Sequence, residues 1–596
     1  MRPSWLIVAL AACTGLAACT IQKANDDDTE PGEGGSGGEA GSSAGGSAGE
    51  TSQGGGAGAT NHGACGDVPV SGICADKSTI KTCVIPETSD PEKDPEKVIT
   101  TSCGTDRECV MDKGVATCKL LGECKTGDTS CKNDTTLLTC AGSGATAKWQ
   151  ETACNTANGE KCVIGKPGTP AKCFPLASSG QPDRLTGTIQ FERKKPNETN
   201  TGWSEVEVRD ATDAYVGVFD GDVMIGKALT GYDIDTQQFN YDGKFTAELS
   251  APITDNTWIW VWAMAFNYDT GQPLMAIAKA KGSDVMANAE GAEEYWAWGA
   301  KVSDLGGGLD LQPMVIRETD GSGAMNAYQW IDFGLQRTQT IPGTTQKSLI
   351  VYWSDQFLPE CGACFCGPQC GGGAVKYGTG AGEVDMYDSF IALGGPPDDE
   401  THWASPVISH EFGHYAMMNY SVSPGEGGPH YLGQASKPGL AYSEAWATAF
   451  AQTNVGNPVY MDQQEGTFFW VDIAKYTYTN GNLEKPDPDG AIDQNLNENV
   501  GAGMIWKLWV PTQTASDQLD IGTDPDGRGL GDSKIFTVLT NPKLIDGTLN
   551  RGYSKVDLVD FFDSALCTSQ ATDADVSAVV ATTGFPYDPA TKPACQ

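Results

Sequence analysis

The segment Ser405–Tyr420 constrains this chain more than any other part of the sequence. It carries the pattern His-Glu-x-x-His at His410, Glu411 and His414. On a helix, residues four apart lie on the same face. The two imidazoles can therefore bind one metal ion, and Glu411 beside them can take a proton from a metal-bound water. The spacing predicts a zinc-binding helix over these residues.

The residues around the motif favour a buried helix. Ser405 is a suitable N-cap, and Pro406 suits the first helical position. Apolar side chains fill much of the remaining helix surface: Val407, Ile408, Phe412, Ala416 and Met417. Two His and a Glu on a buried helix need a partner that satisfies them. The alternative is a chance match on a structural helix, and the crowding of four of the 5 His between residues 402 and 430 argues against it.

A zinc site needs a third protein ligand. Glu444 is the best candidate, because it interrupts the apolar, Ala-rich run 439–452. This composition favours a helix, and a carboxylate buried inside such a run is costly unless it binds a cation. We therefore predict that His410, His414 and Glu444 hold one catalytic zinc ion, with Glu411 as the general base.

The two segments together resemble the zinc helices of gluzincin metallopeptidases, the thermolysin-like and fungalysin-like enzymes. In that family an H-E-x-x-H helix is followed by a Glu, often in a Glu-x-Trp context, and Glu444-Ala445-Trp446 matches this context. The resemblance covers roughly residues 320 to 510 and is specific only at the motifs. It implies an α+β zincin-like peptidase domain, in which the strand expected at 385–393 edges the cleft and pairs with an extended substrate.

The chain departs from that family in two places. The gap between His414 and Glu444 is longer than in thermolysin, and Thr448 stands where the family commonly carries an Asp that orients the first His. The groups that support the ligands are therefore different from those of the family or come from elsewhere in the chain.

Other classes offer weaker third ligands. Metzincins carry Gly and His at the positions of Met417 and Tyr420, so that class is excluded. A Gly-Thr-x-x-Asp pattern like that of aspzincins occurs at Gly522–Asp526, but it lies far downstream in a turn-rich stretch.

The loop after the zinc helix supplies candidates for contacts with substrate or with the transition state. His430 is a candidate ligand, a wall residue, or an electrophilic partner for the tetrahedral intermediate, alongside Tyr431 or Tyr442. A loop His without a catalytic role is an equal alternative for His430. We expect Glu426 in the same loop to be solvated.

Residues 1–19 have the features of a secretory signal: a positive start, a short apolar run, and Leu16-Ala17-Ala18-Cys19. The last four residues resemble a bacterial lipobox, in which the Cys becomes the lipidated N-terminus, so we expect a lipid anchor at Cys19. Cys13 ends a second such pattern but leaves a very short apolar run. Thr20 follows Cys19 in place of an Asp, which by resemblance implies the outer membrane or the cell surface. A plain signal peptide is the alternative.

Two segments follow the signal. Residues 20–63 are rich in Gly and Ser and cannot bury a core, so we expect a flexible tether. Residues 64–120 and 121–176 form two Cys-rich repeats with similar spacings. In an exported chain these even sets of Cys indicate disulfides, and the sequence does not determine which Cys are paired. The Cys of the repeats are Cys65, Cys74, Cys83, Cys103, Cys109 and Cys118, then Cys124, Cys131, Cys140, Cys154, Cys162 and Cys173. We expect a spacer or a module that binds a surface partner.

Strand patterns dominate residues 184–300 and predict a β-sandwich accessory domain, with a removable propeptide as the alternative. The run Trp258–Met264 puts three Trp on one face. We prefer a packed face for these Trp over a sugar-binding platform.

We place the peptidase domain at residues 310–596. In it, the run Cys361–Cys370 holds four Cys, for which two disulfides are favoured over a metal cluster, and Cys567 is left to pair with Cys595. Two Asp-rich turns, Asp487–Gly490 and Asp524–Gly527, gather oxygen ligands without completing an EF-hand loop. Calcium there is the alternative to solvated turns.

Charge excludes one class of partner. The 596-residue chain, long enough for several domains, has 77 acidic and 39 basic side chains and a net charge of −38, so we expect no nucleic-acid partner. We therefore predict a multidomain, exported zinc metalloendopeptidase of protein or peptide substrates, attached to the membrane through its lipid anchor. The alternatives are a catalytically silent adhesion or scaffold lipoprotein and a zinc hydrolase of a non-peptide amide.

Overall fold

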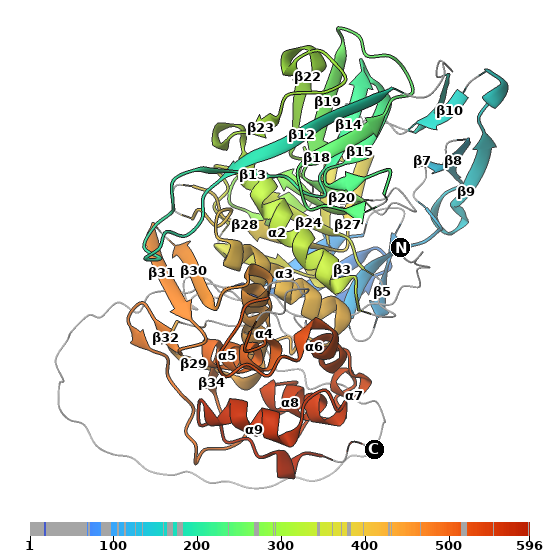
Figure 1. The fold of residues 1–596 in the computed structure, drawn as a ribbon. Coiled ribbons are helices and arrows are strands. Elements are labelled where there is room, and N and C mark those ends of the chain that lie inside the picture. Colours follow the sequence, from blue (N-terminus) through green and yellow to red (C-terminus); the bar gives the residue numbers. More distant parts are fainter. Residues whose placement is uncertain are drawn as a thin grey trace.

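The computed structural model describes part of the 596-residue chain. The described residues are 17–18, 68, 72–84, 97–103, 107–112, 115–124, 127–133, 135–158, 160–163, 171–175, and 183–595 except 237, 267–272, 290, 293, 342–345, 360, 371, 378–382, 397–398, 427–429, 431, 465, 514–520, 552 and 594. The lipidation candidate Cys19, the expected tether 20–63 and Tyr431 lie outside these residues. The described chain is a multidomain mixed α/β structure with many small sheets (Figure 1).

The two Cys-rich repeats fold as short antiparallel strands. The strands of the first repeat are β2 (Ile73–Asp76), β3 (Thr79–Val84), β4 (Lys97–Ser102), β5 (Arg107–Asp112) and β6 (Val115–Leu120). Those of the second are β7 (Thr129–Asn133), β8 (Thr136–Ala141), β9 (Lys148–Ala153), β10 (Glu160–Val163) and β11 (Lys172–Pro175). Both repeats contain a three-stranded sheet and a hairpin: β2-β3-β4 with β5-β6, and β7-β8-β9 with β10-β11.

Disulfide pairing in the repeats agrees with the predicted duplication. In the first repeat Cys74 bonds Cys109 and Cys103 bonds Cys118. In the second, Cys131–Cys162 and Cys154–Cys173 join the same positions in order, and Cys124 bonds Cys140. Cys65, the counterpart of Cys124, lies outside the described residues. Small modules of this kind depend on such bonds, because their apolar cores are slight.

Two four-stranded sheets follow. The first holds β13 (Glu207–Asp210), β12 (Arg184–Arg193) and β18 (Lys244–Glu248) in that order, with β23 (Met314–Ile316) pairing with β12. The second holds β15 (Val223–Leu229), β14 (Tyr215–Asp220), β19 (Thr257–Trp262) and β22 (Ala297–Lys301). The predicted strands in this region are therefore confirmed. A small pair, β16 (Tyr232–Asp233) and β17 (Gln238–Phe239), and the short helix α1 (Val285–Ala289) complete the region.

A six-stranded sheet lies at the centre of the molecule. Its order is β1 (Ala17–Ala18), β25 (Ala363–Cys366), β28 (Ser389–Leu393), β24 (Leu349–Trp353), β21 (Pro273–Lys279) and β20 (Met264–Phe266). Strands β21, β24 and β28 run parallel, and β25 is antiparallel to β28. Because β20 and β21 come from the range expected for the accessory domain, the central sheet spans both expected domains.

The strand expected at the cleft edge is not at the edge of the sheet. Residues 385–393 divide into β27 (Glu383–Tyr387), which pairs with β26 (Gly373–Tyr377), and β28. Strand β28 lies between β24 and β25 and is therefore an interior strand. Beyond it, β25 is followed only by the two-residue strand β1. The expectation for this strand failed because its apolar run fits an interior position as well as an edge.

Each face of the central sheet belongs to a different core. Alternate residues of β24 point to opposite faces. Leu349, Val351 and Trp353 join the core that contains the long helices. Ile350 and Tyr352 join a second core, which also holds Trp262 of β19. Trp262 thus packs against the central sheet as expected, while Trp258 and Trp260 are only half-buried, so the packed face holds for one Trp of the three.

The helices after α1 share a core with one face of the central sheet, and their colours in Figure 1 run from yellow-green to red along the chain. They are α2 (Ser322–Thr338), α3 (Ser405–Tyr420), α4 (Pro438–Val455), α5 (Glu498–Trp509), α6 (Gly531–Leu539), α7 (Pro542–Ile545), α8 (Leu558–Cys567) and α9 (Asp573–Ala581). Short strands lie between α3 and α5: β29 (Ala435–Ser436), β30 (Val459–Gln464), β31 (Thr467–Asp472), β32 (Thr477–Tyr478), β33 (Gly481–Asn482) and β34 (Leu496–Asn497). In the described part of the chain no helix is both long enough and apolar enough to cross a membrane.

The predicted disulfides of this half are present. Cys361 bonds Cys364, Cys366 bonds Cys370, and Cys567 bonds Cys595. The four Cys of the run Cys361–Cys370 are thus accounted for as disulfides. So many disulfides indicate an oxidising or extracellular environment.

Candidate metal centre

Helix α3 places the motif inside the protein. His410, Glu411 and His414 are between 0% and 4% exposed. The N-cap lies one residue earlier than predicted. It is Ala404, and Ser405 and Pro406 are the first two helical residues. Pro is tolerated there because the first turn leaves its N–H groups without intrahelical partners. The predicted cap role of Ser405 is therefore wrong, while the helix itself is confirmed.

Helix α4 packs closely against α3. A Cβ on Gly413 would lie 2.7 Å from the Cα of Ala447, so only glycine allows this approach. The indole Nε1 of Trp446 donates a 3.0 Å hydrogen bond to the carbonyl oxygen of Gly413. These two contacts fix the position of α4 along α3. Glu444, two residues before Trp446, is thereby placed over the two His.

Three ligand atoms converge between the helices. Nε2 of His410 lies 3.1 Å from Oε2 of Glu444, Nε2 of His414 lies 3.3 Å from it, and the two Nε2 atoms are 3.0 Å apart. Ligand atoms on a tetrahedral zinc ion with bonds of about 2.0 to 2.1 Å lie about 3.3 Å apart. His410, His414 and Glu444 therefore form a buried group that can hold a metal ion. The donor set itself does not determine which metal it is.

The protonation of the group suits a cation. Burial alone would raise the pKa of the Glu444 carboxyl, but His414 and His410 bring that pKa well below its usual range. Burial lowers the pKa of His410, and the hydrogen bond with Glu444 offsets this only in part. A neutral imidazole and an ionised carboxylate are the forms that bind metal ions.

Two hydroxyls of α4 support the His ligands. Oγ1 of Thr448 lies 3.0 Å from Nδ1 of His410, and Oγ of Ser443 lies 3.5 Å from Nδ1 of His414. Both residues are at most 4% exposed. Thr448 therefore lies at the ring nitrogen of His410 that is not directed to Glu444. The sequence marked Thr448 but not Ser443, although Ser443 adjoins Glu444.

His430 lies near the ligand group and has its own carboxylate partner. Its Nδ1 is 2.8 Å from Oε2 of Glu498, the first residue of α5, and both side chains are at most 5% exposed. After burial and the two nearer His, His430 also contributes to the lowered pKa of the Glu444 carboxyl. His430 is not one of the three ligands that cluster within the described chain. Sequence reasoning missed Glu498. The available signal was its place directly after Asn497, a good N-cap residue at the start of an apolar helix.

The other loop candidates lie elsewhere. The ring of Tyr442 packs against Phe561 of α8, with centroids 6.0 Å apart, so this residue is directed to α8 rather than to the ligands. Glu426 is not solvated as expected: its Oε1 accepts a 2.5 Å hydrogen bond from Tyr553, and its Oε2 accepts from the backbone N–H of Leu440. It thereby ties the loop after α3 to α4 and to the C-terminal region.

The Asp-rich turn at Asp524–Gly527 already has a cation. Nζ of Lys507 lies 2.9 Å from both carboxylate oxygens of Asp524, and the Asp524 side chain is 1% exposed. Asp526 extends into solvent and is 61% exposed. Among the described residues, Asp526 is not part of the group formed by His410, His414 and Glu444, and Asp524 has a lysine as its cation. The aspzincin-like pattern and the calcium alternative therefore find no support at this turn.

No family model and no curated protein sequence matches this chain. The chemistry of the centre is consequently derived from its own residues: two imidazoles, a carboxylate between them, and a second carboxylate, Glu411, adjacent in the same helix.

Proposed function

We propose that this chain is an exported zinc metallopeptidase that hydrolyses peptide bonds of protein substrates. The convergence of His410, His414 and Glu444 carries the proposal, because these are zinc ligands in type and spacing. Glu411 distinguishes a catalytic from a structural role, since a purely structural site does not need a carboxylate beside its ligands. The gluzincin resemblance at Glu444-Ala445-Trp446 points the same way.

Each residue has a separate task in this proposal. A zinc ion held by the three ligands would polarise a peptide carbonyl and acidify a water bound to it. Glu411 takes the proton of the attacking water and later gives a proton to the departing amine. His430, oriented by Glu498, is the candidate donor to the oxygen that gains negative charge.

Substrate binding is proposed along β25. This strand contacts α3, and an extended peptide can add to the edge of a sheet through backbone hydrogen bonds. The antiparallel pairing of Ala17–Ala18 with Cys364 and Phe365 supports this use, because it places an extended segment on that edge. The disulfides Cys361–Cys364 and Cys366–Cys370 hold the strand in place.

We also propose the arrangement of the whole chain. Residues 1–19 direct export, Cys19 carries the lipid anchor, and 20–63 form the tether. The Cys-rich repeats act as a spacer or a partner-binding module. The two four-stranded sheets act as the β-sandwich accessory domain. The many disulfides support export, since such bonds persist only in oxidising compartments.

The proposal is tested by comparing the mature chain with its Glu411→Gln variant. We expect one zinc per chain in both, and cleavage of unfolded casein by the wild type alone, with a loss of at least about 100-fold in the variant, as expected when a general base is removed. Glu151→Gln, an exposed carboxylate of the second repeat that is 55% exposed, is the matched control and should cleave normally.

Two outcomes contradict the proposal. A folded wild-type chain that binds no zinc would show that the His-His-Glu group is not a metal centre. Full casein cleavage by Glu411→Gln would remove the assigned base and with it the mechanism.

A further inference from the structure

The support of the metal centre comes from the helix that also supplies its third ligand. Thr448 lies one turn beyond Glu444 on α4, and Ser443 lies immediately before it. Thr448 is 3% exposed, and its Oγ1 is 3.0 Å from Nδ1 of His410. One helix thus contributes the carboxylate and both hydroxyls, and it contacts α3 throughout this region.

Metal binding would select one tautomer of His410. Its Nε2 faces Glu444 and His414, so this nitrogen is the one directed to a metal ion. With a metal ion on Nε2, Nδ1 would carry the ring proton and donate a hydrogen bond to Thr448 Oγ1. The same reasoning gives His414 a weaker donor bond to Ser443, because 3.5 Å is at the limit of a hydrogen bond.

Resting on the function proposed above, we propose that Thr448 is the positioning residue of the centre. Its hydroxyl replaces a carboxylate as the acceptor for His410 and sets both the orientation and the tautomer of that ligand. A hydroxyl is neutral, so neither Thr448 nor Ser443 adds a charge. Glu444 therefore supplies the one negative charge of the group formed by the three ligands and these two supporting residues. A carboxylate at position 448 would make His410 a more basic ligand, so this centre binds its metal less tightly than one built with Asp.

The test measures zinc affinity by competition with a chelating dye, without any peptide substrate. Thr448→Val keeps the shape of the side chain and removes the acceptor, and we expect zinc affinity to fall by about 10- to 100-fold, the range for loss of such a partner. Thr448→Ser keeps the hydroxyl and should stay within about threefold of wild type. Ser443→Ala should lose less zinc affinity than Thr448→Val, because the Ser443–His414 contact is longer than the Thr448–His410 contact.

A further variant tests the charge. Thr448→Asp introduces a carboxylate and should bind zinc more tightly than the wild type. Unfolding curves recorded with chelator present compare the metal-free forms and show whether a variant has folded. The absorption spectrum of bound Co²⁺ reports ligand geometry, and we expect it to change in Thr448→Val and to be retained in Thr448→Ser.

The outcomes separate this inference from the proposed function. Unchanged zinc affinity and an unchanged Co²⁺ spectrum in Thr448→Val would overturn the positioning role, while the wild type would still bind zinc and cleave casein. Weaker zinc binding by Thr448→Asp, with a metal-free unfolding curve like that of wild type, would overturn the inference about charge. A wild type that binds no zinc would overturn the proposed function first.

Discussion

Single side chains in this protein are governed by burial and by their nearest charges. In the candidate metal centre, burial would raise the pKa of the Glu444 carboxyl, but the adjoining His414 and His410 hold that pKa well below its usual range. Helix α8 shows the opposite case. Asp557 and Asp560 cap the helix and are at most 4% exposed, and burial raises their pKa values to about 6 and about 8. For Asp560 the charge of Asp557 adds to the effect of burial.

We predict a fall in stability with rising pH that depends on Asp560. Its folded pKa of about 8 exceeds the ordinary value of 3.8, so the folded state holds a proton that the unfolded state releases. The stabilising contribution is full below about pH 4 and is lost as the pH rises to about 8. Asp560→Asn keeps an oxygen that can accept from the Asp557 N–H and removes the titration. The midpoint of thermal unfolding should therefore decline less between pH 4 and 8 in this variant.

Asp546→Asn is the control for this measurement. Hydrogen bonds from Thr548 lower the pKa of the exposed Asp546, so its titration lies below the window and the slope should match wild type. Identical slopes for Asp560→Asn and wild type would contradict the assignment.

At the scale of elements, the close packing of α3 on α4 creates the site. The approach at Gly413 brings Glu444 within 3.3 Å of both His, although 444 is far from 410 and 414 in the sequence. Trp446 fixes the register through its bond to the Gly413 carbonyl. The Glu-x-Trp context thus has a structural reason: the Trp locks the helix that carries the ligand.

We predict that Gly413→Ala disrupts the centre. The new Cβ would meet the Cα and carbonyl oxygen of Ala447, which are backbone atoms and cannot rotate away. Overpacking of this kind costs about 1 to 3 kcal/mol, which outweighs the gain of up to about 1 kcal/mol in helix propensity. The helices should separate and zinc affinity should fall. Zinc competition and chemical denaturation measure the two effects.

Asn419→Ala, in the last turn of the same helix, is the control. Its side chain donates only to the carbonyl of Tyr415, so zinc binding should be unchanged. Full zinc affinity in Gly413→Ala would mean that the approach of α4 does not depend on glycine.

At the scale of the whole molecule, an ion pair with a buried arginine joins the C-terminal helices to the helices around the candidate site. Arg337 of α2 is 2% exposed and lies 2.7 Å from Asp532 of α6, while it also bonds Thr453 of α4. Its guanidinium packs 5.5 Å from the centroid of Trp509 in α5. One side chain thus connects four helices. Removing one partner of such a pair leaves a buried charge and costs several kcal/mol.

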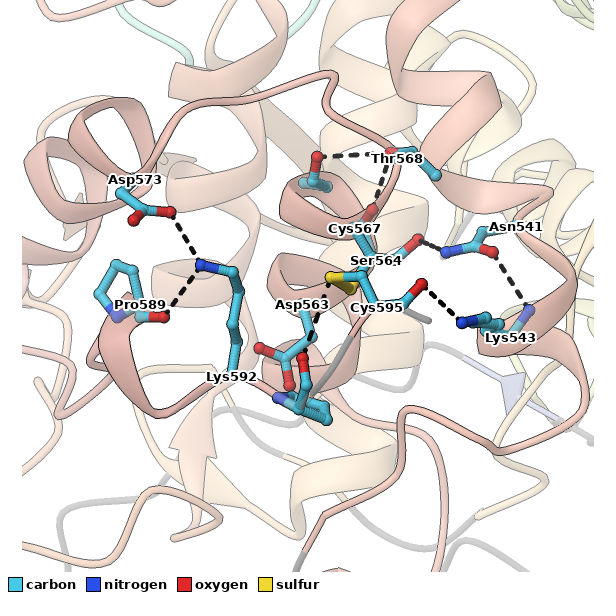
Figure 2. Close-up of a disulfide and its surroundings, with 12 residues drawn as sticks. Asn541, Lys543, Asp563, Ser564, Cys567, Thr568, Asp573, Pro589, Lys592 and Cys595 are labelled. Carbon is cyan, nitrogen blue, oxygen red and sulfur yellow. Dashed lines mark hydrogen bonds and ion pairs between the residues drawn. A yellow bond between two sulfur atoms is a disulfide. The ribbon is translucent and has the colours of Figure 1, made fainter.

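The end of the chain is held by a disulfide, shown in Figure 2. Cys567, the last residue of α8, bonds Cys595 over a sequence separation of 28. Lys543 of α7 donates to the carbonyl oxygen of Cys595, and Lys592 lies 3.2 Å from Asp573 of α9. These contacts close the C-terminal segment against helices α7 to α9.

We predict that the double variant Cys567→Ser/Cys595→Ser is destabilised. Closing a loop of this length in the unfolded chain is worth about 3 to 4 kcal/mol. The loss should appear as a lower denaturant midpoint for the helical region, with zinc still bound below that midpoint, because the centre lies on α3 and α4. The double variant Cys131→Ser/Cys162→Ser is the comparison and should leave that transition unchanged, since it acts on the second repeat. An unchanged midpoint in the first variant would contradict the prediction.

The sequence alone determined the features that depend on local spacing. Residues four apart share a helix face whatever surrounds the helix, so the sequence identified His410 and His414 as a candidate pair of metal ligands. A lone carboxylate in an apolar run identified Glu444 as the candidate third ligand. Alternation marked the long strands of residues 184–300, and the Cys spacings marked the duplicated repeat and the two disulfides of Cys361–Cys370. Only the tertiary structure decided which distant groups meet. It paired His410 with Thr448, His430 with Glu498 and Asp524 with Lys507, directed Tyr442 to α8 and placed β28 inside the sheet. These choices depend on how elements pack against each other, and packing of elements distant in sequence leaves no periodic signal in the residues themselves.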